Sequence, residues 1–136
     1  MPFIIDSSFA LACVLPDESS AAARTVLQRC DHDTIVVPVI WSLEIINGVL
    51  TASRRGRISD ADVARILEAL FLLPVQTDAH PDTQQMRAIM QLGRTYHLTS
   101  YDASYLECAA RNDIPLATLD KKLRAAAHKH DIEVLG

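Results

Sequence analysis

The stretch from Leu98 to Leu123, LTSYDASYLECAARNDIPLATLDKKL, combines a helix, a strand and the start of a second helix. The first helix is predicted to run from about Tyr101 to Arg111. The apolar run Ile114–Leu119 is short and continuous, as in a strand that is buried on both faces. Asp120 ends this strand and begins a helix that is predicted to reach His130. A strand between two helices is the unit from which parallel sheets covered by helices are built.

The rest of the chain continues this alternation. Further strands are predicted at Phe3–Asp6, Thr34–Pro38, Leu72–Gln76 and Ile132–Leu135. Further helices are predicted from Ser7–Ser8 to Leu15, before Pro16; from Ser19–Ser20 through Leu27; from about Trp41 to Arg54–Arg57; from a capping box of Ser59 and Asp62 through Leu70; and from Pro81–Asp82 to about Gly93–His97. This order predicts an α/β fold, a three-layer α/β/α sandwich with a central, mainly parallel sheet.

Composition predicts an ordinary globular protein. The 136 residues are 49% hydrophobic and 22% charged, which is typical of a single domain over residues 1–136. Cys13, Cys30 and Cys108 lack the spacing of a metal site, and such cysteine usage is typical of a reducing, cytoplasmic location. A signal peptide is not expected, because Asp6 interrupts the first apolar run. A membrane span is not expected either, since no stretch has the roughly 18 apolar residues that one needs.

Four acidic residues fall where open parallel sheets bind their ligands. Asp6 and Asp120 each follow a predicted strand, and Glu44 and Asp102 each lie in the first turn of a predicted helix. Carboxylates crowded at one edge of a sheet repel each other unless a cation lies between them. Hard divalent cations such as Mg²⁺ or Mn²⁺ prefer oxygen ligands of this kind.

Each acid also has a purely structural explanation. Asp6 and Asp120 fit helix N-caps, Glu44 fits the positive end of a helix dipole, and Asp102 fits the third position of a capping box opened by Thr99. The formal net charge of −4 argues against a nucleic-acid ligand. These four acids account for that charge, and a bound metal ion would reverse the field around them. A phosphate-bearing substrate is therefore compatible with the sequence.

Polar, basic and aromatic neighbours of the acids form three further groups. Hydroxyl and amide side chains that could orient ligands or water are Ser7, Asn47 and Thr118. Basic residues that could contact substrate phosphates are Arg54, Arg55, Arg57, Lys121, Lys122 and Arg124, although the three in the Arg54–Arg57 stretch equally fit a solvated turn. Trp41 and Tyr101 could stack on a base or simply pack. The five histidines are predicted to be solvated.

Other acidic α/β designs fit this chain less well. A phosphatase with an aspartyl nucleophile usually has a second Asp two residues after the first, where this chain has Ser8. A receiver domain needs a pair of acids after the first strand, which here offers only Asp6. A glycine-rich phosphate loop is excluded, because the chain has only four scattered glycines.

Four segments together resemble a PIN domain, and specifically the toxin subunit of a VapBC toxin–antitoxin pair: IIDSSFAL (4–11), VPVIWSLEIINGVL (37–50), LTSYDASYLECAARNDIPLATLDKKL (98–123) and IEVL (132–135). The resemblance covers the whole chain in the right order, and the third segment is its most specific part. It implies a metal-dependent endoribonuclease. The metal-binding acids would be Asp6, Glu44, Asp102 and Asp120, with Ser7 and Thr118 as supporting hydroxyls. It also implies a homodimer that a cognate antitoxin silences.

The residue types suggest how such an enzyme would work. Mg²⁺ or Mn²⁺ held by carboxylates can activate a water that attacks an RNA phosphodiester, and Asp102 or Asp120 could help to deprotonate that water. Apolar residues in Leu43–Leu50 and Val63–Leu73 exceed what one buried face needs, as expected of a dimer interface. The alternative is a binding module with the same fold, whose acids cap helices or bind a partner's basic tail.

Overall fold

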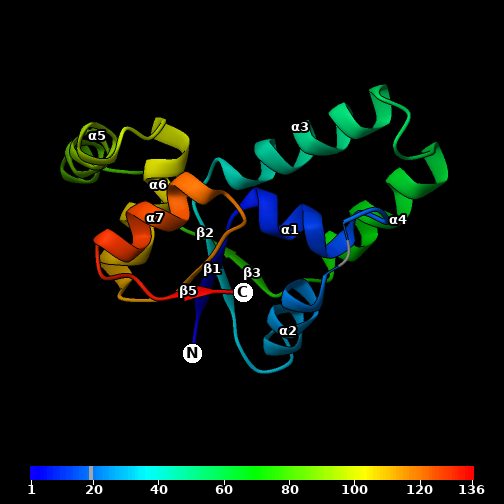
Figure 1. Ribbon diagram of the computed structural model, residues 1–136, viewed down its shortest axis with the longest axis horizontal. Coiled ribbons are helices and arrows are strands. Elements are labelled where there is room, and N and C mark those ends of the chain that lie inside the picture. Colours follow the sequence, from blue (N-terminus) through cyan, green and yellow to red (C-terminus); the bar gives the residue numbers. More distant parts are fainter. Residues whose placement is uncertain (19) are drawn as a thin grey trace.

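The computed structural model describes residues 1–18 and 20–136, and it has a five-stranded sheet between two layers of helices (Figure 1). The strands are β1 (Phe3–Ile5), β2 (Ile35–Val37), β3 (Val75–Thr77), β4 (Leu116–Ala117) and β5 (Val134–Leu135). Their spatial order is β3-β2-β1-β4-β5, and every neighbouring pair is parallel. The predicted three-layer α/β fold is thus confirmed, with a sheet that is parallel throughout.

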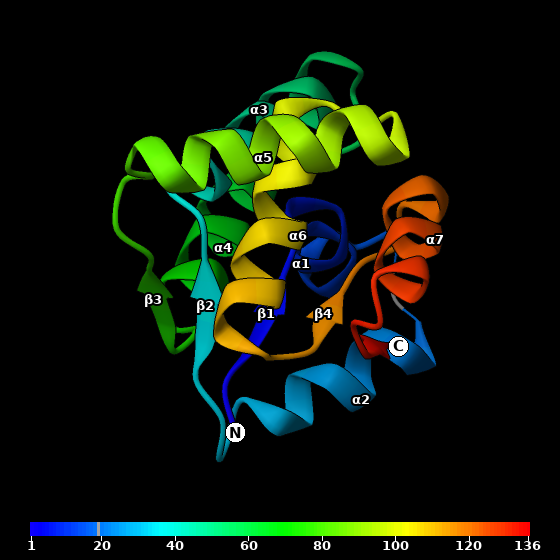
Figure 2. The ribbon, with the colours of Figure 1, turned by 90° about the vertical axis from the view of Figure 1, so that its left-hand side faces the viewer.

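The helices divide between the two faces of the sheet. One layer holds α1 (Ser7–Val14), α2 (Ala21–Arg29), α3 (Trp41–Arg54) and α4 (Asp60–Phe71); the other holds α5 (Thr83–Tyr96), α6 (Ser100–Asn112) and α7 (Lys121–Lys129). Figure 1 shows the first group to the right of the strands and the second to the left, and Figure 2 shows α6 in front of β1. This division follows from right-handed crossovers, because the chain adds strands first toward β3 and then toward β5. No helix in the described residues is long and apolar enough to cross a membrane.

The core lies on both sides of the central strands. All three residues of β1 are completely buried, as are Ile35 of β2 and Leu116 of β4. Helix α6 covers β1 and β4 with a nearly continuous buried segment that includes Tyr105 and Leu106. Parallel strands buried on both faces need continuous apolar runs, which is why the strands were recognisable in the sequence.

Most helix starts are those that the sequence predicts. Ser59 and Asp62 form the predicted capping box of α4, in which each side chain accepts the other residue's backbone N–H, at 3.0 and 3.2 Å. Ser20 caps α2 by accepting a hydrogen bond from the N–H of Ala23 at 3.1 Å. Ser19, which the sequence also placed at this helix start, lies outside the described residues.

All five strands have bounds that differ from the predicted ones, and two of these differences have clear local reasons. Strand β1 stops at Ile5, because Asp6 is the N-cap of α1 and not the last residue of the strand. The third strand is Val75–Thr77 where Leu72–Gln76 was predicted, because α4 continues to Phe71 and its C-cap is Leu72. An apolar stretch at the end of an amphipathic helix resembles a short buried strand, so hydrophobicity alone did not separate the two.

The chain reverses its winding direction between β1 and β4. These strands are neighbours, with Ile4 opposite Leu116 and Ile5 opposite Ala117, although more than a hundred residues separate them in sequence. From β1 the chain leaves toward β2, whereas from β4 it leaves toward β5. The crevice between two such strand ends is where open α/β sheets bind ligands.

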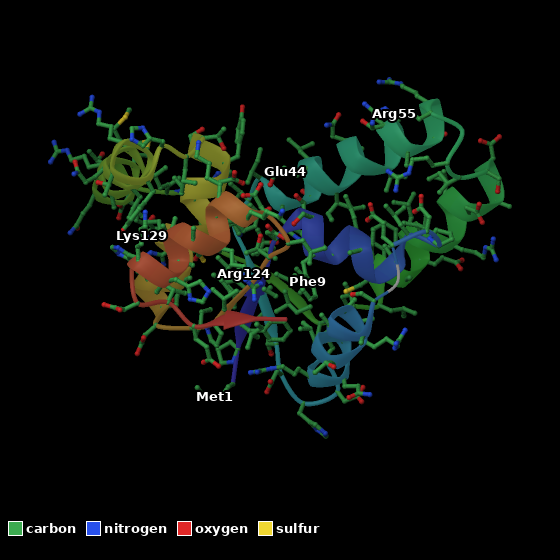
Figure 3. All side chains as sticks on the ribbon, viewed as in Figure 1. Met1, Phe9, Glu44, Arg55, Arg124 and Lys129 are labelled. Carbon is green, nitrogen blue, oxygen red and sulfur yellow. The ribbon has the colours of Figure 1, made fainter. Side chains whose placement is uncertain are left out.

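Close packing of α3 against α1 places another helix start at the same edge. A Cβ atom at Gly48 would lie 2.3 Å from Leu11 Cδ1 of α1, so any side chain there would push Leu11 aside. The glycine lets the two helices approach, and the first turn of α3, with Glu44, lies beside the start of α1 (Figure 3). The fold therefore brings chain segments near residues 6, 44, 102 and 120 to one edge.

Candidate active site

Asp6 lies at the centre of this edge and is only 4% exposed. Its Oδ1 accepts hydrogen bonds from the N–H of Phe9 at 2.9 Å and from the Ser8 hydroxyl at 2.7 Å. Its Oδ2 accepts a hydrogen bond from the hydroxyl of Thr118, which is completely buried. Asp6 is thus both the N-cap of α1 and the hydrogen-bonded link between β1 and the end of β4.

The end of β4 is tied to this carboxylate through two hydroxyls. Thr118 Oγ1 accepts the N–H of Asp120 at 3.1 Å, and Ser8 Oγ accepts the N–H of Leu119 at 3.4 Å. Asp120 then caps α7 by accepting the N–H of Leu123 at 2.8 Å. These bonds fix the carboxylates of Asp6 and Asp120 on adjacent strand ends, as the sequence predicts.

Glu44 reaches the edge from α3, where it lies in the first turn. Its Oε1 accepts a hydrogen bond from the Tyr105 hydroxyl of α6 at 2.6 Å. Burial raises the pKa of Tyr105, and the nearby carboxylate of Glu44 raises it further, so the phenol is a neutral donor. A helix from one layer is thereby joined to a helix from the other layer across the edge of the sheet.

Asp102 lies in the first turn of α6, one helical turn before Tyr105. Thr99 caps the helix by accepting the backbone N–H of Asp102 at 3.2 Å. In the described residues, the capping boxes with both reciprocal bonds are those of α4 and α5, and the start of α6 is not among them. The predicted capping-box role of the Asp102 carboxylate is therefore wrong, which leaves this carboxylate free to face the other acids.

Electrostatics link all four acids. Burial raises the pKa of Asp6, and the charge of Asp120 adds to this increase. Burial also raises the pKa of Glu44, with a further contribution from Asp6. The pKa of Asp102 rises to about 6, first through burial and then through the charges of Asp120, Glu44 and Asp6. The charges of Asp6, Glu44 and Asp120 therefore destabilise the ionised form of Asp102, as expected where carboxylates crowd together.

The chemistry of the four side chains fits a hard cation, but their arrangement is open. All four offer carboxylate oxygen, the donor that Mg²⁺ and Mn²⁺ prefer. Among the described residues, no three His, Cys, Asp or Glu side chains form a group that could hold a metal ion together. Both oxygens of Asp6 already accept hydrogen bonds. An ion that keeps several of its waters suits such an open arrangement better than one that needs a closed set of protein ligands.

The three predicted supporting residues lie in different surroundings. Thr118 bonds Asp6 directly, as described above. Ser7 contacts the hydroxyl of Tyr105, which in turn donates a hydrogen bond to Glu44. Asn47 is exposed on α3, one turn after Glu44. Thr118 thus lies in the cluster and Ser7 at its border, whereas Asn47 borders it from the solvent side.

The predicted basic residues are spread along the edge. Lys121 and Lys122 are exposed in the first turn of α7, and Lys122 is close enough to Asp102 to lower its pKa against the effect of burial. Arg54 and Arg55 are exposed at the far end of α3, about 15 Å along the helix from Glu44 at 1.5 Å per residue; Figure 3 shows this separation for Arg55.

Two residues that the sequence suggested for substrate contacts are engaged elsewhere. Arg124 donates to the carbonyl oxygens of Thr118 and Gly136, at 3.4 and 3.0 Å, so it supports the chain end instead of facing the acids. Trp41 is buried in the core, which favours packing over stacking on a base. Tyr101, by contrast, is 55% exposed. All five histidines are exposed, as predicted.

Sequence reasoning missed two side chains of the cluster. Ser8, not its neighbour Ser7, donates to Asp6, because the second position of a helix lies beside the N-cap carboxylate. That position could have been inferred from helix geometry. Tyr105 bonds Glu44 across 61 residues of sequence. Its only local signal was its spacing of three residues from Asp102, which places both on one side of α6.

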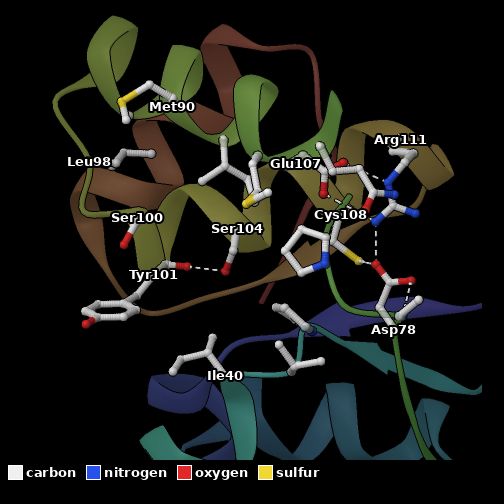
Figure 4. Close-up of a pocket in the computed structure, with 18 of the residues that line it drawn as sticks. Ile40, Asp78, Met90, Leu98, Ser100, Tyr101, Ser104, Glu107, Cys108 and Arg111 are labelled. Carbon is white, nitrogen blue, oxygen red and sulfur yellow. Dashed lines mark hydrogen bonds and ion pairs between the residues drawn. The ribbon is translucent and has the colours of Figure 1, made fainter. Parts of the chain in front are cut away.

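A pocket of about 590 Å³ lies between α5, α6 and the segments that follow β2 and β3 (Figure 4). Its wall is mostly apolar and includes Ile40, Met86, Met90 and Leu98. At one end Arg111 pairs with Asp78 and Glu107 (Figure 4). The described residues around this pocket include none of the four clustered acids, so the pocket and the acidic edge are separate features.

The protein is therefore an α/β protein with a parallel sheet. Its candidate site is a group of carboxylates between β1 and β4, where the chain reverses its winding direction. Within that class the chain belongs to the PIN domain family, which it matches over residues 3–129. The resemblance found in the sequence is thereby confirmed.

Several known proteins are similar to this chain in sequence or in structure. The chain is 30% identical over 132 residues to ribonuclease VapC12 of Mycobacterium tuberculosis, covering 96% of this chain and 95% of that protein. It is 27% identical over 124 residues to ribonuclease VapC3 of Pyrobaculum aerophilum, covering 90% and 92%. The crystal structure of VapBC2 from Rickettsia felis bound to a DNA fragment from their promoter has the same fold, with a TM-score of 0.68 at 12% identity and coverage of 98% and 97%.

Proposed function

We propose that this protein is a metal-dependent endoribonuclease and the toxin of a type II toxin–antitoxin pair. The observation that carries the proposal is the set of four carboxylates at the β1–β4 switch point, three of which have pKa values raised partly by other members. Membership of the PIN domain family and similarity to two proteins named ribonuclease VapC supply the reaction class. The substrate is RNA, and the bond cleaved is the phosphodiester.

The four acids Asp6, Glu44, Asp102 and Asp120 would hold Mg²⁺ or Mn²⁺, in part through water. Such an ion, when bound, lowers the pKa of its water and stabilises charge on phosphate oxygens. Thr118 and Ser8 hold the Asp6 carboxylate in one orientation, and Tyr105 does the same for Glu44. The chain thus fixes the positions of its charges before substrate arrives.

Asp102 is the candidate general base in the cluster. Without a metal ion its pKa is raised to about 6, so it holds a proton more readily than an ordinary aspartate does. Lys122, which is close to Asp102, would hold the neighbouring phosphate of the substrate by charge. We assign Lys121, Arg54 and Arg55 to more distant phosphates, since all three are exposed and the two arginines lie at the far end of α3 from Glu44.

The partners follow from the family and from exposed apolar side chains. Leu43, Ile46 and Leu50 form a stripe on α3 with 64%, 47% and 44% exposure, on the side opposite to the buried face. In α4 the large apolar residues are mostly packed, and the exposed large ones are Phe71 and its neighbour Leu72. We propose that a cognate antitoxin and a second copy of this chain cover these surfaces. The proposal of an antitoxin is supported by the shared fold with a structure named VapBC2.

A binding module without nuclease activity is the alternative function. It is favoured by the N-caps that Asp6 and Asp120 form, and by the absence of a ready three-ligand group in the described residues. The two functions differ in their response to metal. A nuclease with this cluster should gain thermal stability in Mg²⁺ or Mn²⁺, because a ligand that binds only the folded state stabilises it, whereas caps alone should give no such gain.

The experiment that tests the nuclease is mapping of RNA ends after brief expression of the wild type and of four single variants. Asp6→Asn, Glu44→Gln, Asp102→Asn and Asp120→Asn should each lose nearly all cleavage and still fold. Asp82→Asn is a matched control, because Asp82 caps α5 in the same way as Asp6 and Asp120 cap their helices, away from the cluster. Full activity in any two of the four cluster variants would refute the assignment.

A further inference from the structure

We propose that Tyr105 is a positioning residue that sets the orientation of Glu44 and so determines how tightly the acidic cluster binds a divalent cation. Its hydroxyl donates to Glu44 Oε1 at 2.6 Å. The inference rests on the proposed function, because it concerns the same four acids. It adds a residue that is neither acidic nor exposed and that acts through Glu44.

Tyr105 is well suited to hold another side chain in place. It is 1% exposed and is the largest fully buried side chain in the described residues, so its ring is fixed by packing on all sides. Only its hydroxyl reaches the border of the site, where Ser7 also contacts it. A rigid hydrogen-bond donor restricts the conformations of a flexible acceptor. Glu44 has three rotatable side-chain bonds, so holding it in place beforehand lowers the conformational entropy that it loses on binding a cation.

The position of Tyr105 on α6 couples two of the four acids. Asp102 and Tyr105 are three residues apart and therefore lie on the same side of that helix. Glu44 lies on α3, in the opposite layer of the sandwich. The hydrogen bond from Tyr105 to Glu44 thus fixes Glu44 relative to Asp102, although the two acids lie far apart in the sequence.

The hydrogen bond also fixes the direction of both carboxylate oxygens of Glu44. Oε1 accepts from the phenol, and within residues 1–18 and 20–136 no hydrogen bond to Oε2 is formed. A cation would therefore meet Oε2 in a fixed direction. Residues that orient ligands in this way typically contribute about 10- to 100-fold to metal affinity or activity.

The test compares Tyr105→Phe with the wild type and with Tyr96→Phe. Both variants lose one phenolic hydroxyl, but the Tyr96 hydroxyl bonds His130 Nδ1 at 3.0 Å, away from the acids. Free Mn²⁺ is measured by electron paramagnetic resonance during titration of each protein, and RNA cleavage is measured over the same Mn²⁺ range. Circular dichroism in the absence of metal checks that each variant is folded.

We expect the Mn²⁺ dissociation constant of Tyr105→Phe to rise about 10-fold or more, while Tyr96→Phe matches the wild type. Cleavage by Tyr105→Phe should return toward the wild-type rate at saturating Mn²⁺, whereas a merely structural defect would lower the rate at every concentration. In a Glu44→Gln background, Tyr105→Phe should cause no further loss of Mn²⁺ affinity, because the carboxylate that it orients is gone.

The possible failures are distinguishable. A wild type that binds Mn²⁺ and cleaves RNA, beside a Tyr105→Phe variant with unchanged affinity, overturns the role of Tyr105 and leaves the nuclease intact. An equal loss of affinity on adding Tyr105→Phe to the wild type and to Glu44→Gln also overturns it, since the effect would not pass through Glu44. A wild type that neither binds Mn²⁺ nor cleaves RNA overturns both proposals.

Discussion

Replacing Asp102 by Asn should stabilise the metal-free protein above pH 6 while abolishing its activity. The prediction follows from the pKa of Asp102, which burial and three neighbouring carboxylates raise from 3.8 to about 6. Between pH 3.8 and about 6, Asp102 therefore keeps its proton in the folded protein but has lost it in the unfolded chain. The negative charge of ionised Asp102 destabilises the folded protein. Asparagine removes this charge and keeps the shape of the side chain.

The sign of the pH dependence follows from proton linkage. Because the folded-state pKa is raised, the folded protein binds more protons than the unfolded chain between pH 3.8 and about 6. Stability from this group is complete below the unfolded pKa and falls as pH rises through the folded pKa. Asparagine does not titrate, so the advantage of Asp102→Asn over the wild type should grow across this window and level off above it.

The magnitude is a balance of two effects. A difference of about two pKa units corresponds to about 3 kcal/mol, which solvent screening at a partly exposed side chain reduces. Against this, a carboxylate in the first turn of α6 gains about 0.3–1 kcal/mol from the helix dipole, and asparagine loses that gain. The net stabilisation expected at pH 7.5 is about 1–2 kcal/mol, or about 3–10 °C in Tm for a chain of this length.

Thermal unfolding in a chelator, at pH 4 and at pH 7.5, measures this effect directly. Asp102→Asn should unfold at a higher temperature than the wild type at pH 7.5 and at a similar temperature at pH 4. Addition of Mn²⁺ should then reverse the order at pH 7.5, because only the wild type keeps the full set of acids. Equal stability at pH 7.5 in chelator, or an increase that is the same at both pH values, would refute the electrostatic coupling of the cluster.

Three further predictions concern substrate and partners. Lys122→Gln should weaken RNA binding and make KM less sensitive to salt, as measured by cleavage rates at two salt concentrations, because a phosphate contact releases counterions; equal salt dependence would contradict it. Leu43→Glu combined with Ile46→Glu should shift the protein toward monomer in light scattering, since both side chains are exposed on α3; an unchanged mass would place the dimer elsewhere. An antitoxin segment should place a basic residue, most simply arginine, among the carboxylates, so inhibition should weaken when that arginine is removed or Mg²⁺ is raised; a complex whose inhibitory segment lies far from Asp6 would show another route.

Much of the fold was predictable from the continuous apolar runs in the sequence. Strands buried on both faces need continuous apolar runs, and the chain has such runs at Phe3–Ile5, Ile35–Val37 and Ile114–Ala117. Acids at or shortly after the ends of two of these runs had to lie near the carboxyl edge of a parallel sheet. The positions of Asp6 and Asp120 therefore followed from the sequence together with the parallel order of the strands.

The rest of the site depended on contacts that periodicity does not encode. In the sequence, Tyr105 looks like one more buried residue of α6. Only the three-dimensional structure shows that its hydroxyl reaches Glu44 of α3 across the edge of the sheet. Arg124 follows Asp120 closely in sequence, which suggested a phosphate contact, yet it donates a hydrogen bond to the carbonyl oxygen of Gly136. Both outcomes are set by tertiary geometry between segments that are distant in sequence.

The structural and functional explanations of the acids are not exclusive. Asp6 and Asp120 cap α1 and α7, and Glu44 and Asp102 lie in the first turns of α3 and α6, so the positive ends of four helices converge on one edge. Each such end stabilises a carboxylate by about 0.3–1 kcal/mol, which offsets part of the repulsion among the four. The fold can therefore hold a concentrated negative charge without an ion, and that charge is what would draw a divalent cation to this edge.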